Sequence, residues 1–280
     1  MGVVPCCYRK ELKGLTDEAV GIVTMFLQYV DQDWPLYFSL VLACPGSGVQ
    51  CALTKTMNPA LAYGISRAIG VTWNLAEKAY SIVVPKHTAK LTLYAVLHEL
   101  MHGFVAFKLD MKDWERHKEI CRECTRRFQE NVGEGVVSRI LQRRISKAYR
   151  QPLITRPLIW FYKKILPKDV EPVFETIFAE MIVWPLSWKL WEIPGYEHEE
   201  VRCLINKHFP MITEDRCPEL YSFVDDIIRR YGLDPVTEND LEMMLSKPHL
   251  KRSYEALDKL ARMNPRKKSC IQYYYRVKFG

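Results

Sequence analysis

Two histidines and a glutamate stand in the chain at a spacing suited to metal chemistry. The residues from His98 to His102 read His-Glu-Leu-Met-His, with Glu99 directly after the first histidine. Because four residues of an α-helix turn through about 400°, both imidazoles would lie on one helical face, where they can hold Zn²⁺ at about 2.0–2.1 Å each. Glu99 could take a proton from a water on the ion, since the metal lowers the pKa of that water towards ~7. The spacing therefore predicts a zinc centre with Glu99 as its general base.

The segments around this motif predict a helix that would present it. Residues 80–85 are rich in β-forming residues and end at a proline, which favours a strand at the edge of a sheet. Thr88 can then cap a long helix over residues 89–108, which carries both histidines. Chance alone gives the five-residue pattern in roughly one of a hundred chains with 7 histidines among 280 residues. The alternative is therefore a helical protein whose motif holds no metal.

Helical patterns dominate the rest of the chain. Apolar residues at helical spacing predict further helices over residues 12–30, 58–69, 113–149, 218–231 and 237–245, and again from residue 173. A short buried strand is expected at residues 36–43, and prolines after residue 150 indicate a boundary there. With 48% apolar and 26% charged residues, the chain is neither disordered nor collagen-like. We predict an α+β fold, mainly α, with one domain over residues 1–150 and a helical C-terminal region over residues 151–280.

The order of a strand and then a helix with this motif resembles the zincin metallopeptidases, over about residues 75–145. The resemblance implies a zincin-like catalytic domain with a small sheet and an active-site helix, and zinc-dependent hydrolysis of peptide bonds. It also implies a peptide or protein substrate that pairs with the sheet edge as an added strand. Val105 and Lys108 stand where the metzincin branch has Gly and His, which excludes that branch. The gluzincin branch, in which a later helix supplies a glutamate ligand, remains.

The gluzincin-like resemblance places the third ligand in the segment from residue 129 to residue 137. Glu134, followed by Gly135 and small apolar residues, resembles the Glu-Gly-x-Ala arrangement of the family, and Glu134 is the favoured ligand. Glu130 with Glu134 also resembles a second family form, in which the first glutamate ligates the metal and the second acid supports a histidine. The two carboxylates lie one helical turn apart and would face the same way. The alternative is a solvated glutamate pair on a charged helix.

A more distant carboxylate stays open as the ligand. Residues 178–182 read Phe-Ala-Glu-Met-Ile and distantly resemble the glutamate helix of other gluzincins, which would make Glu180 or the nearby Glu175 the ligand. Zinc enzymes of this kind usually add a donor that stabilises the oxyanion. No pattern selects that donor from the histidines and tyrosines eligible for it, which are Tyr149, Tyr162, Tyr196, His198 and His208.

The charge of the chain leaves a second class of function open. Forty Lys and Arg against 33 Asp and Glu give a net charge of +7, which is too small to indicate nucleic-acid binding by itself. Basic residues nevertheless cluster between Arg122 and Arg150 and again at residues 266–268. Solvated helix faces explain such clusters, and so does contact with nucleic acid. The alternative function is a nucleic-acid-binding or regulatory protein built on a zincin-like domain, with proteolysis restricted or lost.

No segment of the sequence predicts export or membrane insertion. No apolar stretch of signal-peptide length follows Met1. The most apolar region, residues 173–191, contains three charged residues and Pro185, so it is expected to be a buried helix rather than a bilayer span. We therefore expect a cytoplasmic protein without a transmembrane segment, in an oligomeric state that the sequence leaves open.

The nine cysteines form an odd and rather high number. Cys44 and Cys51 flank a turn and could close it as a disulfide, although buried free thiols are favoured inside a cell. His117, Cys121 and Cys124 share one helical face and could hold a structural zinc ion, but no fourth ligand is evident. Buried or exposed thiols are the favoured interpretation of these cysteines.

Overall fold

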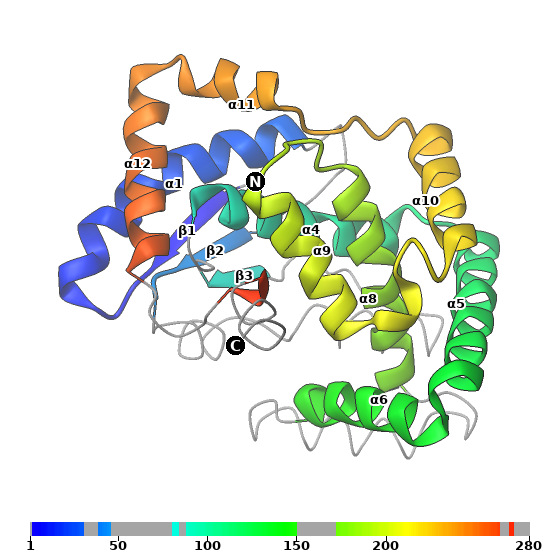
Figure 1. The fold of residues 1–280 in the computed structure, drawn as a ribbon. Helices are drawn as coiled ribbons and strands as arrows, with labels where there is room; N and C mark the ends of the chain where they lie inside the picture. The colour runs from blue at the N-terminus through cyan, green and yellow to red at the C-terminus, as the bar shows by residue number, and fades with distance from the viewer. Residues whose placement is uncertain are drawn as a thin grey trace.

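A small parallel sheet packs beside a larger set of helices (Figure 1). The computed structural model describes residues 2–30, 39–45, 80–83, 88–149, 172–263 and 269–271. The strands are β1 (Gly2–Cys6), β2 (Ser39–Ala43) and β3 (Tyr80–Val83). The helices of the first half are α1 (Lys10–Val30), α4 (Ala89–Phe107), α5 (Met111–Val132) and α6 (Glu134–Tyr149). Those that follow are α8 (Pro172–Lys189), α9 (Tyr196–His208), α10 (Pro218–Tyr231), α11 (Glu238–Leu245) and α12 (Pro248–Arg262), with the 3₁₀ turn η2 (Pro210–Ile212).

The described strands form one sheet in the order β1-β2-β3, with every pairing parallel. Parallel neighbours need a crossover connection, and α1 provides it between β1 and β2. Leu40 and Leu42 of β2 are buried, because alternate residues of a strand face the same side. The strands expected near residues 36–43 and 80–85 are confirmed over their described residues. The sequence does not predict β1, since Pro5 lacks a backbone donor, but an edge strand tolerates that loss.

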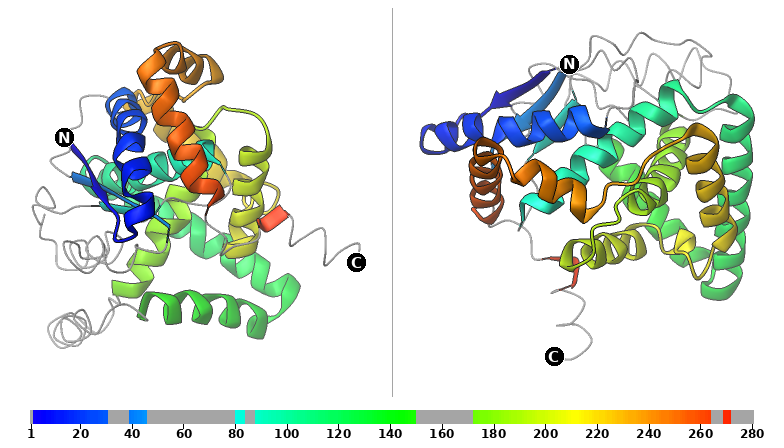
Figure 2. Two further views of the ribbon diagram at one scale, coloured as in Figure 1. Left: turned by 90° about the vertical axis from the view of Figure 1, so that its left-hand side faces the viewer. Right: turned by 90° about the horizontal axis from the view of Figure 1, so that it is seen from above.

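Helix α1 lies between the sheet and α12, as the view from above in Figure 2 shows. Its apolar stripe is fully buried at Ala19, Ile22 and Phe26. The helices approach closely near Ser253 of α12, whose hydroxyl donates to the carbonyl of Glu18 at 2.6 Å and accepts from the backbone N–H of Ile22 at 2.8 Å. The pairing of α1 with α12 therefore joins the two ends of the described chain into one core.

Gly21 makes this close approach possible, because a Cβ atom at residue 21 would lie 3.0 Å from the Ser253 Oγ. We expect Gly21→Val to lower the free energy of unfolding by about 1–3 kcal/mol through overpacking. A Cβ atom at Gly14, on the same helix, would meet no other part of the described chain within 4 Å. Gly14→Ala should therefore raise the free energy of unfolding by up to ~1 kcal/mol through helix propensity. Denaturant titration measures both changes, and a Gly21→Val protein as stable as the parent would contradict the packing argument.

The long helical region expected over residues 113–149 is divided into α5 and α6. Gly133 separates the two helices with a backbone φ of +86°, a conformation that favours glycine. Figure 1 shows α6 crossing below α8, away from α4. The single predicted region is thus corrected to two helices that run in different directions.

The helices after residue 172 continue the same core. Apolar residues of α8, α9, α10, α11 and α12 belong to one buried cluster with those of α1, α4 and α5. The helices expected at 218–231 and 237–245 are confirmed, and Thr237 caps α11 in a reciprocal pair with Asp240. The helix expected at 58–69 and the boundary near residue 150 lie outside the described residues. Within the described part of the chain, no helix is both long and apolar enough to span a membrane.

Disulfides tie several of these elements together. Cys7 bonds to Cys44 at the ends of β1 and β2. Cys124 of α5 bonds to Cys217 before α10, and Cys203 of α9 bonds to Cys270. The expectation that these cysteines are free thiols is wrong, and Cys44 pairs with Cys7 rather than with Cys51. Cys121 is a free and buried thiol.

Candidate metal centre

Helix α4 presents His98 and His102 on one face, as the motif predicted. Thr88 starts the helix, since its hydroxyl accepts the backbone N–H of Leu91 at 3.2 Å. The other faces of α4 are apolar and buried, so the helix is held within the core. The two imidazoles are 8% and 5% exposed, and their ring centroids lie 5.0 Å apart. Two nitrogen ligands thus lie side by side at the edge of the core.

Helix α8 brings a carboxylate to this pair. The Glu180 Oε2 lies 3.6 Å from the His98 Nε2, and its Oε1 lies 3.7 Å from the His102 Nε2. One ligand atom from each of the three side chains lies within 4.8 Å of the other two. In a tetrahedral zinc site with bonds of about 2.0–2.1 Å, neighbouring ligand atoms stand about 3.3–3.4 Å apart. The two distances from the histidines to Glu180 exceed that spacing by a few tenths of an ångström.

The chemistry of this donor set fits zinc. Two imidazole nitrogens and one carboxylate are a known catalytic zinc set, and three protein ligands leave a fourth position for water or substrate. Burial lowers the pKa of His102 to about 4, which the charge of Glu180 opposes. His102 is therefore neutral at pH 7, the form that a metal ion requires. Glu180 is 28% exposed, so the group opens towards solvent on the side of the carboxylate.

Glu99 lies next to the candidate ligands and is partly buried. Burial raises the pKa of Glu99 to about 7, with His98 opposing the shift and Glu180 adding to it. A carboxyl group with a pKa near the working pH exchanges protons effectively in both directions. Glu99 thus lies beside the candidate ligands with a pKa in the range in which a carboxyl group can both accept and donate a proton.

The expected third ligand, Glu134, is not at this site. Glu134 is exposed at the first residue of α6, and the alternative Glu130 is exposed and ion-paired with Arg126. Neither belongs to the group of potential ligands that contains His98 and His102. The reason is tertiary, because α5 leads away from α4 and the chain turns at Gly133. The side chain of Glu175 lies outside the described residues.

The sequence also contains a physical argument for a ligand within residues 173–191, although the resemblance to family motifs favours Glu134. Residues 173–191 are expected to form a buried helix, and few charged residues interrupt its apolar side chains. A charge within a buried helix needs a partner, since an unpaired buried charge is costly. Two histidines facing a predicted metal site are suitable partners. That argument applies to Glu175 and Glu180 alike, and the structure brings Glu180 to the two histidines.

A second group of potential ligands is not a metal centre in this state. Cys124, Cys217 and Glu219 also lie within 4.8 Å of one another, but the two sulfur atoms are bonded to each other. Cys124 therefore cannot act as a thiolate beside His117 and Cys121, as the less favoured structural zinc site would require. Burial lowers the pKa of His117 to about 3, so its ring is neutral.

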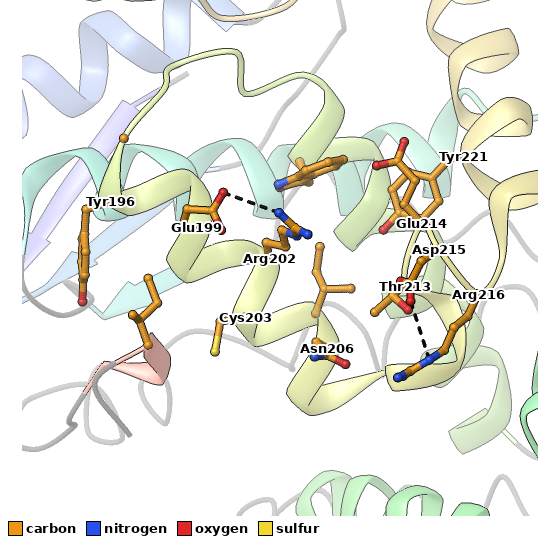
Figure 3. Close-up of a pocket in the computed structure, with 14 residues that line it drawn as sticks. Tyr196, Glu199, Arg202, Cys203, Asn206, Thr213, Glu214, Asp215, Arg216 and Tyr221 are labelled. Carbon is orange, nitrogen blue, oxygen red and sulfur yellow. Dashed lines mark ion pairs between the residues drawn. The ribbon is translucent and has the colours of Figure 1, made fainter. Parts of the chain in front are cut away.

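A separate cavity of about 950 Å³ lies between α9, α10 and the turn before α10 (Figure 3). Its walls carry both signs of charge, and ion pairs join Arg202 to Glu199 at 3.7 Å and Arg216 to Asp215 at 3.9 Å. None of the three candidate zinc ligands lines it. The cavity is thus distinct from the candidate metal centre.

Comparison with known proteins identifies no family. No family model matches the chain, and no solved structure matches it. Among curated proteins, it is similar to a probable transposase for insertion sequence element ISA1214 from Archaeoglobus fulgidus. The two are 25% identical over 111 residues, which are 39% of this chain and 34% of the transposase. The chain thus spans about a third of the length of that relative.

Proposed function

We propose that the protein is a zinc-dependent, gluzincin-like metallopeptidase. His98, His102 and Glu180 bind Zn²⁺, and Glu99 is the general base. One observation carries this proposal. The Nε2 atoms of His98 and His102 lie 3.6 and 3.7 Å from the carboxylate oxygens of Glu180, and the partly buried Glu99 follows His98 in the chain. The third ligand is therefore Glu180 in place of the expected Glu134, and the zincin-like character of the fold is part of the same proposal.

The roles of the side chains follow from their positions. When bound, zinc would lower the pKa of a water molecule and polarise the carbonyl of a peptide bond. His98 and His102 supply neutral nitrogen lone pairs, and Glu180 supplies the negative charge that offsets the dication. Glu99 accepts the proton of the attacking water and passes it to the leaving amine. β3 is an edge strand among the described strands, and a peptide substrate could pair with it.

A nucleic-acid-related function is the second candidate, and the similarity to a transposase favours it. Two of the four arginines of the basic cluster whose side chains the structure describes are in ion pairs within the protein. Arg126 pairs with Glu123 and Glu130, and Arg127 pairs with Glu219. Arg122 and Arg139 are exposed residues of the same cluster that could contact phosphate groups.

Zinc content and proteolysis together test the proposal. Purified protein should contain one zinc ion per chain and should cleave an unfolded protein or a quenched peptide library. A chelator such as 1,10-phenanthroline should stop the cleavage, and added Zn²⁺ should restore it. Protein without stoichiometric zinc would contradict the proposal. Salt-sensitive binding to DNA or RNA, without cleavage of any peptide, would support the second candidate.

A further inference from the structure

A buried chain of hydrogen bonds lies behind His98, on the side away from Glu180. The His98 Nδ1 lies 3.4 Å from the Oγ of Ser187, and the Tyr94 hydroxyl lies 2.8 Å from the same oxygen. Ser187 is fully buried, and Tyr94 is 4% exposed. The ring of Trp184 packs against His98 with centroids 4.5 Å apart. His98 is thus held on its Nδ1 side by groups that take no part in the proposed metal binding.

The number of available protons decides which atoms donate and which accept in this series of hydrogen bonds. A serine hydroxyl has one proton to donate and two lone pairs that accept. The Ser187 Oγ lies 2.7 Å from the backbone carbonyl of Val183, a distance at which two oxygens attract only when a proton lies between them. Its proton is therefore committed to Val183, with the carbonyl of Trp184 at 3.2 Å as the weaker acceptor. The Oγ can then only accept from Tyr94 and from His98.

We propose that Ser187, supported by Tyr94, is a positioning residue that keeps the proton of His98 on Nδ1. The Nε2 of that tautomer carries the lone pair that the proposed zinc ion would take. In the metal-free protein the Glu180 carboxylate, 3.6 Å from the same Nε2, is the acceptor with which Ser187 competes for the proton of His98. Neutral imidazole binds metal through its unprotonated nitrogen, so the hydrogen bond at the other nitrogen determines which atom can ligate. The role in metal binding rests on the proposed function, whereas the tautomer does not.

Helix α8 carries both Ser187 and the proposed third ligand, Glu180. Ser187 follows Glu180 by seven residues, and seven residues of an α-helix complete nearly two turns. Both side chains therefore project from the same face of α8 towards α4. One helix thus supplies a metal ligand and the group that orients another ligand, so a shift of α8 would disturb both.

The tautomer of His98 can be measured in the metal-free protein. Long-range ¹H–¹⁵N correlation of ¹⁵N-histidine-labelled protein distinguishes the two ring nitrogens by their chemical shifts. The parent protein should show His98 protonated at Nδ1, and Ser187→Ala should shift it towards the Nε2–H form. We expect Ser187→Ala to weaken zinc binding by about 10–100-fold, as do other losses of a partner behind a ligand. Tyr94→Phe should cause a smaller loss, because Ser187 then keeps its contact with His98.

Controls separate positioning from general damage to the fold. Ser222→Ala, at an exposed residue of α10, should change neither the tautomer nor the zinc affinity. Ser187→Thr retains the hydroxyl and should restore the Nδ1–H tautomer. If Ser187→Ala does not fold, the parent and Tyr94→Phe spectra still decide the question. His98 protonated at Nε2 in the parent, or unchanged in a folded Ser187→Ala protein, would overturn the inference. Failure to bind zinc with His98 protonated at Nδ1 would instead overturn the proposed function alone.

Discussion

Glu180→Ala should abolish stoichiometric zinc binding, whereas Glu134→Ala should leave it unchanged. Removing Glu180 leaves two neutral imidazoles to hold a dication. The expected loss of affinity is more than about 100-fold, beyond the range seen when only a supporting partner of a ligand is removed. Glu134 is exposed and belongs to no cluster with the histidines, so its removal takes nothing from the site. Competition with a chromogenic chelator measures both affinities.

Glu180→Gln sharpens this comparison, because the amide keeps the shape of the side chain and removes its charge. It should lose zinc nearly as fully as the alanine variant. Melting curves of the metal-free proteins show whether the variants remain folded. The reverse pattern, with zinc lost from Glu134→Ala and retained by Glu180→Ala, would show that the helices approach one another differently in solution.

Glu99→Gln should retain zinc and lose peptide-bond hydrolysis by about 10²–10⁴-fold, the usual contribution of a general base. The amide has nearly the same shape as the carboxylate, but it cannot accept a proton from water. Glu99 is not among the three candidate ligands, so the zinc content should stay at one per chain. The measurement is kcat for a quenched peptide substrate, together with zinc analysis of the same sample.

Glu119→Gln provides a matched control, since Glu119 is an exposed residue of α5. It should leave kcat and zinc content unchanged. Full activity in Glu99→Gln would show that another group moves the proton, and the assigned mechanism would be wrong. Loss of zinc in that variant would place Glu99 among the ligands instead.

Much of the local structure could be predicted because it depends on neighbours in the chain. His98 and His102 lie on one face of α4 because they are four residues apart on a helix. Thr88 caps that helix, so its start is visible in the sequence. The bounds of α10 were predicted from Pro218 at its start and Gly232 after its end. In each of these cases the decisive interactions lie within a few residues, so their pattern is visible in the sequence.

The break at Gly133 and the strand β1 were missed for different physical reasons. Glycine within a helical pattern is tolerated at a cost of about 1 kcal/mol, so the pattern alone does not show whether the chain turns there. β1 contains Pro5 and is short, so its local signal is weak. Its pairing with β2 and the disulfide between Cys7 and Cys44 stabilise it, and both partners are distant in the sequence.

The amino-acid sequence by itself determined the pair of histidines, the adjacent Glu99 and the helix that carries them, because helical geometry relates these residues over four positions. Only the tertiary structure decided which carboxylate completes the group and which hydroxyl lies behind His98. Glu134 and Glu180 both occur in segments that resemble ligand motifs, and the choice between them depends on which helix packs against α4. That packing arises from apolar surfaces far apart in the chain, and α8 buries its own against α4 while α6 is turned away after Gly133.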